Sequence, residues 1–238
     1  MLPLRDNIPA RRYPGVTFGL VALNVFAFLY ELRLGSDLEV FLFRWGLVPV
    51  RYTHLEIAQF FSLPQQLLPF FTSQFLHGGW THLLGNLWIL WIFGDNVEDR
   101  VGHGRYLLLY LCGGAMAGLL HVIISANSSA PTIGASCAVA VVMGAYFRFY
   151  PQARVTTLIP PFFLGPFLEL PAVLFLGIWF LIQFFSGTLS LLAHPGHIGG
   201  IAWWAHIGGF LFGALTCQIF ADSPVRRRPE DREGDWQT

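Results

Sequence analysis

Long apolar segments, separated by shorter polar ones, dominate the pattern of side chains along this chain. Six of these segments approach the length of about 20 residues with which an α-helix crosses a bilayer. A further apolar segment, 158–167, is broken by three prolines and is expected to be an interfacial loop. The pattern therefore predicts an all-α, polytopic membrane protein with a bundle of six transmembrane helices. The six segments are 16–34, 80–96, 105–125, 134–150, 170–190 and 200–220.

The composition also indicates a membrane protein, because 54% of the 238 residues are hydrophobic and 12% are charged, against about 25% charged residues in soluble proteins. No polar linker divides the apolar segments, so residues 1–222 are predicted to form a single membrane domain with a short cytoplasmic segment, 1–15, at its start. Residues 223–238 are rich in charge and proline and are expected to be disordered. The net charge of zero, without a basic face interleaved with aromatic residues, argues against nucleic-acid binding.

Arginine placement predicts the orientation, because the cytoplasmic flanks of membrane spans are enriched in basic residues. With six spans and both termini in the cytoplasm, only Arg33, Arg44 and Arg51 fall on the outer side. An odd number of spans would move one terminal arginine cluster outside. We therefore expect both termini to lie in the cytoplasm. The membrane is expected to be a bacterial-type cell membrane. The cytoplasmic arginines would be Arg5, Arg11, Arg12, Arg100, Arg105, Arg148, Arg154, Arg226, Arg227, Arg228 and Arg232.

The first outer loop, 35–79, is long and carries many apolar side chains, among them Trp45 and Phe60. Amphipathic pieces of this kind can lie in the headgroup layer without crossing the membrane. A helical loop that packs on the bundle fits the same pattern equally well, so both arrangements remain open. In either case the loop would border the outer ends of the helices.

Two polar side chains begin the second apolar segment. His82 and Asn86 are four residues apart, so they share one face of a helix. A histidine and an amide on one face can donate hydrogen bonds to a single developing negative charge. The alternative is that they hold neighbouring membrane helices together through hydrogen bonds.

Small residues recur at intervals of four in the fourth and sixth segments, where they let two helices approach closely. Such packing would bring the hydroxyl of Ser136 within about 2.6–3.2 Å of His206, the distance at which a histidine can activate a nucleophile. A lone serine in a membrane helix more often forms a hydrogen bond with its own backbone. The predicted pairing with His206 is therefore what favours a catalytic role for Ser136. The spaced positions are Ser136, Ala140 and Gly144 in the fourth segment and Ala205, Gly209 and Gly213 in the sixth.

These motifs together resemble the rhomboid family of intramembrane serine proteases. The resemblance rests on the HxxxN pair of His82 and Asn86, the segment from Gly134 to Ser136, and the AHxxGxxxG sequence from Ala205 to Gly213. It extends over essentially the whole chain from the first predicted span to the sixth.

The resemblance implies that Ser136 is the nucleophile and His206 the general base of a cavity that opens to the outer side. The oxyanion would be held by the backbone N–H of Ser136 and by the side chains of His82 and Asn86. It implies no cofactor and no third catalytic carboxylate, and Glu98 is expected to belong to a cytoplasmic helix end. The expected partners are the lipid bilayer and other membrane proteins, whose transmembrane segments would be cleaved near the outer surface.

One position departs from the family pattern, because Cys137 stands where the GxSG motif ends in glycine. This leaves a catalytically impaired, rhomboid-like pseudoprotease that binds transmembrane clients as the alternative. Cys137 itself is a poor candidate nucleophile, since adjacent helix positions point about 100° apart. A small transporter would require internal repeats, which the chain lacks. No metal site is expected, because His194 and His197 supply only two ligands.

Overall fold

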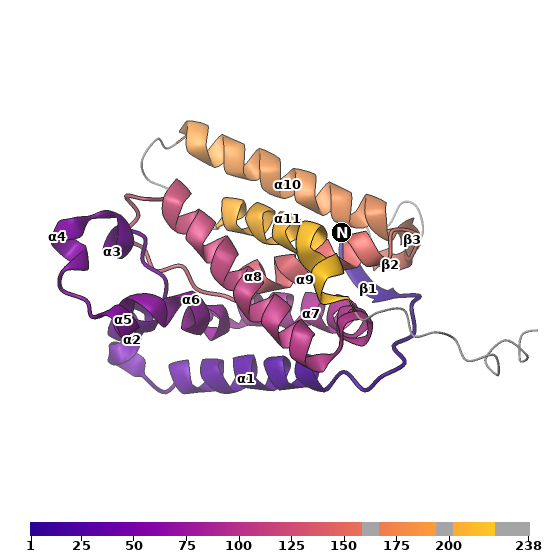
Figure 1. The fold of residues 1–238 in the computed structure, drawn as a ribbon, viewed down its shortest axis with the longest axis horizontal. Coiled ribbons are helices and arrows are strands. Elements are labelled where there is room, and N and C mark those ends of the chain that lie inside the picture. The colour runs from indigo at the N-terminus through magenta and orange to yellow at the C-terminus, as the bar shows by residue number, and fades with distance from the viewer. Residues whose placement is uncertain (159–166, 194–201, 222–238) are drawn as a thin grey trace, which may run out of the picture.

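The computed structural model describes residues 1–158, 167–193 and 202–221, without the side chains of 191–193. Its main body is a set of long helices that coincide with the predicted apolar segments (Figure 1). The boundaries differ by a few residues, most of all in α7, which continues to Val101. The tail 223–238 and most of the segment 158–167 lie outside the described residues. The long helices are α1 (Gly15–Glu31), α7 (Trp80–Val101), α8 (His103–Ile124), α9 (Ser136–Phe149), α10 (Ala172–Ala193) and α11 (Trp203–Phe220).

The predicted number of spans is only partly supported by the lengths of these helices. In α8, and in Ala172–Ser190 of α10, the helix is long and apolar enough to cross a membrane by itself. The bent pair Gly15–Glu31 and Gly35–Trp45, with 113° between its two parts, is a third candidate. No other helix of the described residues meets these criteria, so six spans stay a prediction.

A three-stranded antiparallel sheet corrects the prediction of an all-α fold: the chain is mostly helical but contains β1 (Leu2–Asp6), β2 (Arg154–Leu158) and β3 (Leu168–Pro171). The strand order is β1-β2-β3, and Leu2 lies opposite Leu158. Strands of four or five residues are at the lower limit of length at which an alternating pattern indicates a strand. The segment 1–15 is therefore partly built into the fold.

The centre of the bundle is α9, which packs against α7, α8 and α11, whereas α1 and α10 lie at opposite edges (Figure 1). Every residue from Cys137 to Tyr146 is buried. The neighbouring helices therefore enclose α9 over most of its 14 residues.

The contact between α9 and α11 is made backbone to backbone at the predicted small residues. A Cβ added at Gly144 would lie 1.9 Å from the carbonyl oxygen of Phe210, and one added at Gly213 would lie 1.9 Å from that of Val141. At Gly209 the corresponding distance to the oxygen of Cys137 is 2.5 Å. No side chain larger than hydrogen fits these places, so the glycines determine how closely the two helices approach.

The loop between α1 and α7 is a series of short helices, part of which packs on the bundle as one of the two predicted arrangements requires, whereas placement in the headgroup layer stays a prediction. Its Leu47 is buried, and its backbone N–H and carbonyl exchange hydrogen bonds of 3.0 and 2.8 Å with Thr132. Leu55 and Phe60, in contrast, are 86% and 79% exposed. The elements are η1 (Gly35–Asp37), α2 (Leu38–Trp45), α3 (Val50–Thr53), α4 (Leu55–Ala58), α5 (Leu63–Leu67), α6 (Pro69–Thr72) and η2 (Ser73–Phe75).

Candidate active site

Ser136 is the first residue of α9. The turn that places it there depends on Gly134, whose φ of +125° is unfavourable for any residue with a side chain. The turn is held by a 2.9 Å hydrogen bond from the Gly134 N–H to the carbonyl of Ser73. Because the first N–H groups of a helix have no intrahelical acceptor, the backbone N–H of Ser136 can serve a ligand.

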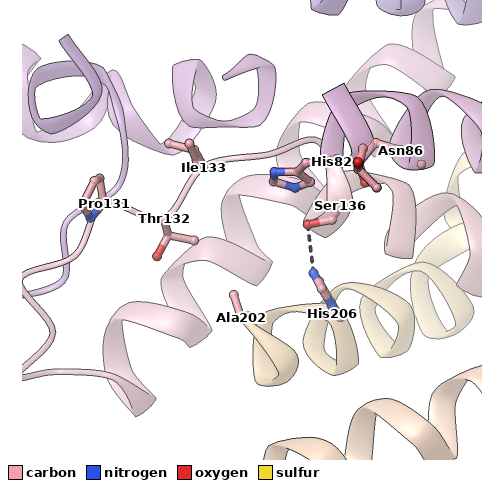
Figure 2. Close-up of a pocket in the computed structure, with 10 residues that line it drawn as sticks. His82, Asn86, Pro131, Thr132, Ile133, Ser136, Ala202 and His206 are labelled. Carbon is pink, nitrogen blue, oxygen red and sulfur yellow. Dashed lines mark hydrogen bonds between the residues drawn. The ribbon is translucent and has the colours of Figure 1, made fainter. Parts of the chain in front are cut away.

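His206 lies in the first turn of α11 and is 9% exposed. Its Nε2 is 2.8 Å from the hydroxyl oxygen of Ser136, as Figure 2 shows. This distance falls within the predicted range. The two helices that the glycines bring together therefore each contribute one member of a serine–histidine pair, which we call the dyad.

Gln183 of α10 completes the hydrogen bonds of the imidazole, and the sequence did not lead us to it. Its Oε1 lies 2.7 Å from Nδ1 of His206, and its side chain is 6% exposed. An amide in so apolar a helix is nevertheless a signal of a functional contact.

His82 lies beside Ser136, on the first turn of α7 (Figure 2). The N–H of Gly78 donates to Nδ1 of His82 over 3.4 Å, which leaves the proton of a neutral ring on Nε2. A Cβ added at Gly134 would lie 2.6 Å from this Nε2. His82 is therefore a donor packed against the turn that presents Ser136.

Asn86 is held by His77, which lies just before α7. The Nδ2 of Asn86 lies 3.1 Å from Nε2 of His77, and Nδ1 of His77 lies 3.2 Å from the carbonyl oxygen of Phe75. Burial is the main cause that lowers the pKa of His77 to about 4. Neutral His77 thus donates from Nδ1 and accepts from the Asn86 amide, whose second N–H is left for another acceptor.

A cavity of about 620 Å³ connects these groups (Figure 2). Its wall combines the two members of the dyad with His82 and Asn86, the two side chains predicted to bind the oxyanion. The lining residues are Thr81, His82, Gly85, Asn86, Pro131, Thr132, Ile133, Ser136, Ala202 and His206.

Cys137 does not line this cavity. The residue is 7% exposed and packs in a cluster with Ala117 of α8, with Ala202 just before α11 and with Ala205 of α11. The cysteine is enclosed by three alanines, of which Ala202 also lines the cavity. The structure therefore has room for a cysteine at the position where the family motif has glycine.

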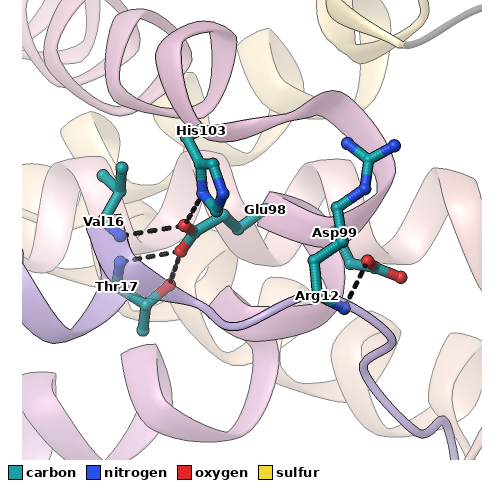
Figure 3. A network of polar contacts seen from close by, with 6 residues as sticks. All are labelled: Arg12, Val16, Thr17, Glu98, Asp99 and His103. Carbon is teal, nitrogen blue, oxygen red and sulfur yellow. Dashed lines mark hydrogen bonds and ion pairs between the residues drawn. The ribbon is translucent and has the colours of Figure 1, made fainter.

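The acidic residues at the end of α7 have a structural role. The carboxylate of Glu98, which is 1% exposed, accepts hydrogen bonds from the backbone N–H groups of Val16 and Thr17 at 2.8 and 2.7 Å (Figure 3). The hydroxyl of Thr17 and the ring of His103 also bind it. A carboxylate here satisfies the free N–H groups of α1 and interacts favourably with its dipole.

Among residues 1–158, 167–193 and 202–221, no group of three or more His, Cys, Asp or Glu side chains could hold a metal ion. His194 and His197 lie outside the described residues.

In a comparison with known protein families, the family model of the rhomboid domain matches residues 64–223 of the sequence. The chain belongs to the rhomboid family. The resemblance inferred from the motifs is thereby confirmed. Among curated relatives, this rhomboid is 27% identical over 61% of its length to the presenilin-associated rhomboid-like protein A, mitochondrial, of Danio rerio, of which it covers 36%.

Two further relatives cover other shares of the chain. The presenilin-associated rhomboid-like protein, mitochondrial, of Bos taurus is 24% identical over 82% of this rhomboid and 46% of its own length. The rhomboid protease GluP of Bacillus subtilis is 32% identical over 58% of this rhomboid and 24% of its own length. The chain therefore spans less than half the length of these relatives.

The mitochondrial names of the presenilin-associated relatives contradict one expectation. A bacterial-type cell membrane was the wrong prediction for this rhomboid. The arginine distribution reports only which sides of a membrane the loops favour, and it carries no information on which membrane that is.

Proposed function

We propose that this rhomboid is an intramembrane serine endopeptidase that hydrolyses peptide bonds in or near transmembrane segments of other membrane proteins. The observation that carries the proposal is the 2.8 Å contact between Ser136 Oγ and His206 Nε2 at the wall of the cavity. Membership of the family and the name of the Bacillus subtilis relative, a rhomboid protease, support it.

The reaction begins when the hydroxyl of Ser136 attacks the carbonyl carbon of the scissile bond. His206 accepts the hydroxyl proton on Nε2 and later gives it to the leaving amine, which produces an acyl-enzyme and a free amino terminus. A water molecule then attacks the ester, with His206 again as the base. The second product leaves as a carboxylate and Ser136 is regenerated.

The negative charge on the carbonyl oxygen forms next to three donors: the backbone N–H of Ser136, the Nε2–H of His82 and the free N–H of Asn86. Donors that are already in place cost no reorganisation when the charge develops. Loss of one such donor lowers the catalytic rate roughly 10²- to 10³-fold. The His82→Ala and Asn86→Ala variants are therefore expected to be slow rather than inert.

The setting of the reaction follows from the same proposal. The six long helices would each cross the bilayer, with both chain termini on one side and the cavity opening to the other. Substrates would be helices of neighbouring membrane proteins, which must partly unwind before a carbonyl reaches Ser136. The names of the relatives support a mitochondrial membrane as the location.

A cleavage assay in proteoliposomes tests the proposal, using a reporter whose transmembrane segment contains small and helix-breaking residues. Wild-type protein should cleave it, and Ser136→Ala and His206→Ala should not. If both variants cleaved the reporter at the wild-type rate, the role of the dyad would be refuted.

The alternative is a rhomboid-like protein that binds transmembrane clients without cleaving them, and Cys137 is the feature that motivates it. Labelling of Ser136 by a fluorophosphonate probe separates the two cases, because the probe reacts only with an activated serine. An unlabelled wild-type protein that still binds the reporter would favour the alternative.

A further inference from the structure

One face of α10 is directed at the imidazole of His206. Trp179, Gln183 and Gly187 follow one another at intervals of four and therefore lie along this face. The Trp179 ring lies 6.3 Å from the His206 ring, centroid to centroid, at an interplanar angle of 33°. A Cβ added at Gly187 would lie 3.1 Å from Cβ of Trp203, so the absence of a side chain there lets α10 approach the start of α11.

The contact between Gln183 and His206 determines which ring nitrogen carries the proton. The carbonyl oxygen of Gln183 can only accept, so a neutral His206 bonded to it carries its proton on Nδ1. The unprotonated Nε2 then faces the hydroxyl of Ser136, from which it is 2.8 Å away. A general base needs this arrangement, because the opposite tautomer would offer Ser136 an N–H instead of a lone pair.

We propose that Gln183 is the positioning residue of the dyad: its amide oxygen holds His206 in the tautomer and orientation that allow it to accept the proton of Ser136. This assignment rests on the proposed function and deepens it. An uncharged amide oriented toward the histidine takes the place that a carboxylate has in a serine triad, as the asparagine does in Cys-His-Asn proteases. No proton passes to Gln183, whose oxygen accepts the same hydrogen bond before and after His206 is protonated.

The charge of the step supports an acceptor at this position. When Nε2 takes the serine proton, His206 becomes a cation, and its Nδ1–H becomes a stronger donor. The bond to the Gln183 oxygen is therefore stronger in the transition state than in the resting enzyme, which is the condition for an interaction to raise kcat.

The test compares wild-type protein with Gln183→Met, which keeps the length of the side chain without an acceptor, and with Gln183→Glu, which restores an acceptor oxygen. Cleavage of the reporter by Gln183→Met is expected to show kcat lowered about 10- to 100-fold, the effect of leaving a buried donor unpaired, with KM changed less than about threefold. Gln183→Glu should recover most of the loss. A merely structural role predicts lower thermal stability in Gln183→Met with kcat unchanged, and that result would overturn the assignment.

A spectroscopic measurement on the full chain makes the test independent of activity. In protein labelled with ¹⁵N-histidine, the His206 signals, identified by their loss in His206→Asn, should report a proton on Nδ1 in wild type and a shift toward Nε2–H in Gln183→Met. The same tautomer in both proteins would refute the role of Gln183. If wild-type protein showed the Nδ1–H tautomer but cleaved nothing, the proposed function would fail while the positioning contact stood.

Discussion

Replacing Cys137 with glycine tests whether the departure from the family motif disables the site. Cys137 is 7% exposed, packs against Ala117, Ala202 and Ala205, and does not line the cavity. Cys137→Gly removes Cβ and Sγ, each comparable to a buried methylene worth about 0.8 kcal/mol. Glycine in a helix adds a backbone cost of roughly 0.5–1 kcal/mol. The free energy of unfolding should therefore fall by about 2 kcal/mol.

Cys137→Ala is the matched control, because it removes only the sulfur and keeps the helical backbone preference. It should lose about 1 kcal/mol, which places it between wild type and Cys137→Gly. Unfolding of the purified protein in mixed micelles measures both values, and cleavage of the reporter measures activity. We expect the kcat/KM of both variants to stay within about threefold of wild type. A gain of tenfold or more in Cys137→Gly would show that the cysteine crowds the dyad, and the packing argument would be wrong.

Three other features allow direct tests. Gly134→Ala combines a φ of +125° with a Cβ 2.6 Å from His82. Activity should fall by about 5- to 150-fold, the equivalent of roughly 1–3 kcal/mol of strain, and unchanged cleavage would show that the turn adapts. Glu98→Gln removes the charge from the side chain that binds the start of α1 and should lower the free energy of unfolding by about 1–3 kcal/mol. Chemical denaturation measures this loss. A fluorophosphonate should still label Ser136 in the variant. Burial lowers the pKa of His77 from 6.5 to about 4 in the folded protein. As the pH falls, His77 therefore binds a proton in the unfolded chain at a higher pH than in the folded one. Its contribution to stability is therefore complete above pH 6.5 and is lost as the pH falls toward 4, and a melting temperature measured across this range should fall less steeply in His77→Gln.

The site was largely predictable because its motifs depend on local spacing. The interval of four between His82 and Asn86 places them on one face of α7 in any helix. The glycines of α9 and α11 likewise indicated a close approach before the partner helix was known. The distance of 2.8 Å between Ser136 and His206 is the outcome of that approach.

The supporting residues were not predictable in the same way. Gln183 has no motif that connects it to His206, and the contact exists only because α10 lies against the start of α11. The bond of His77 to Asn86 likewise depends on the turn before α7, which no motif predicts. In both cases the deciding contact joins segments whose relative placement no local pattern specifies.

The sequence by itself determined the helical segments, the candidate nucleophile and base, and the family. Hydropathy and the spacing of small residues at intervals of four are local patterns, which can be recognised within one or two helical turns. The tertiary structure decided the sheet, in which Leu2 meets Leu158, the direction of the Cys137 side chain, and the acceptor for the second nitrogen of His206. These features depend on packing between distant segments, whose free energy is shared among many contacts and is not encoded at any single position.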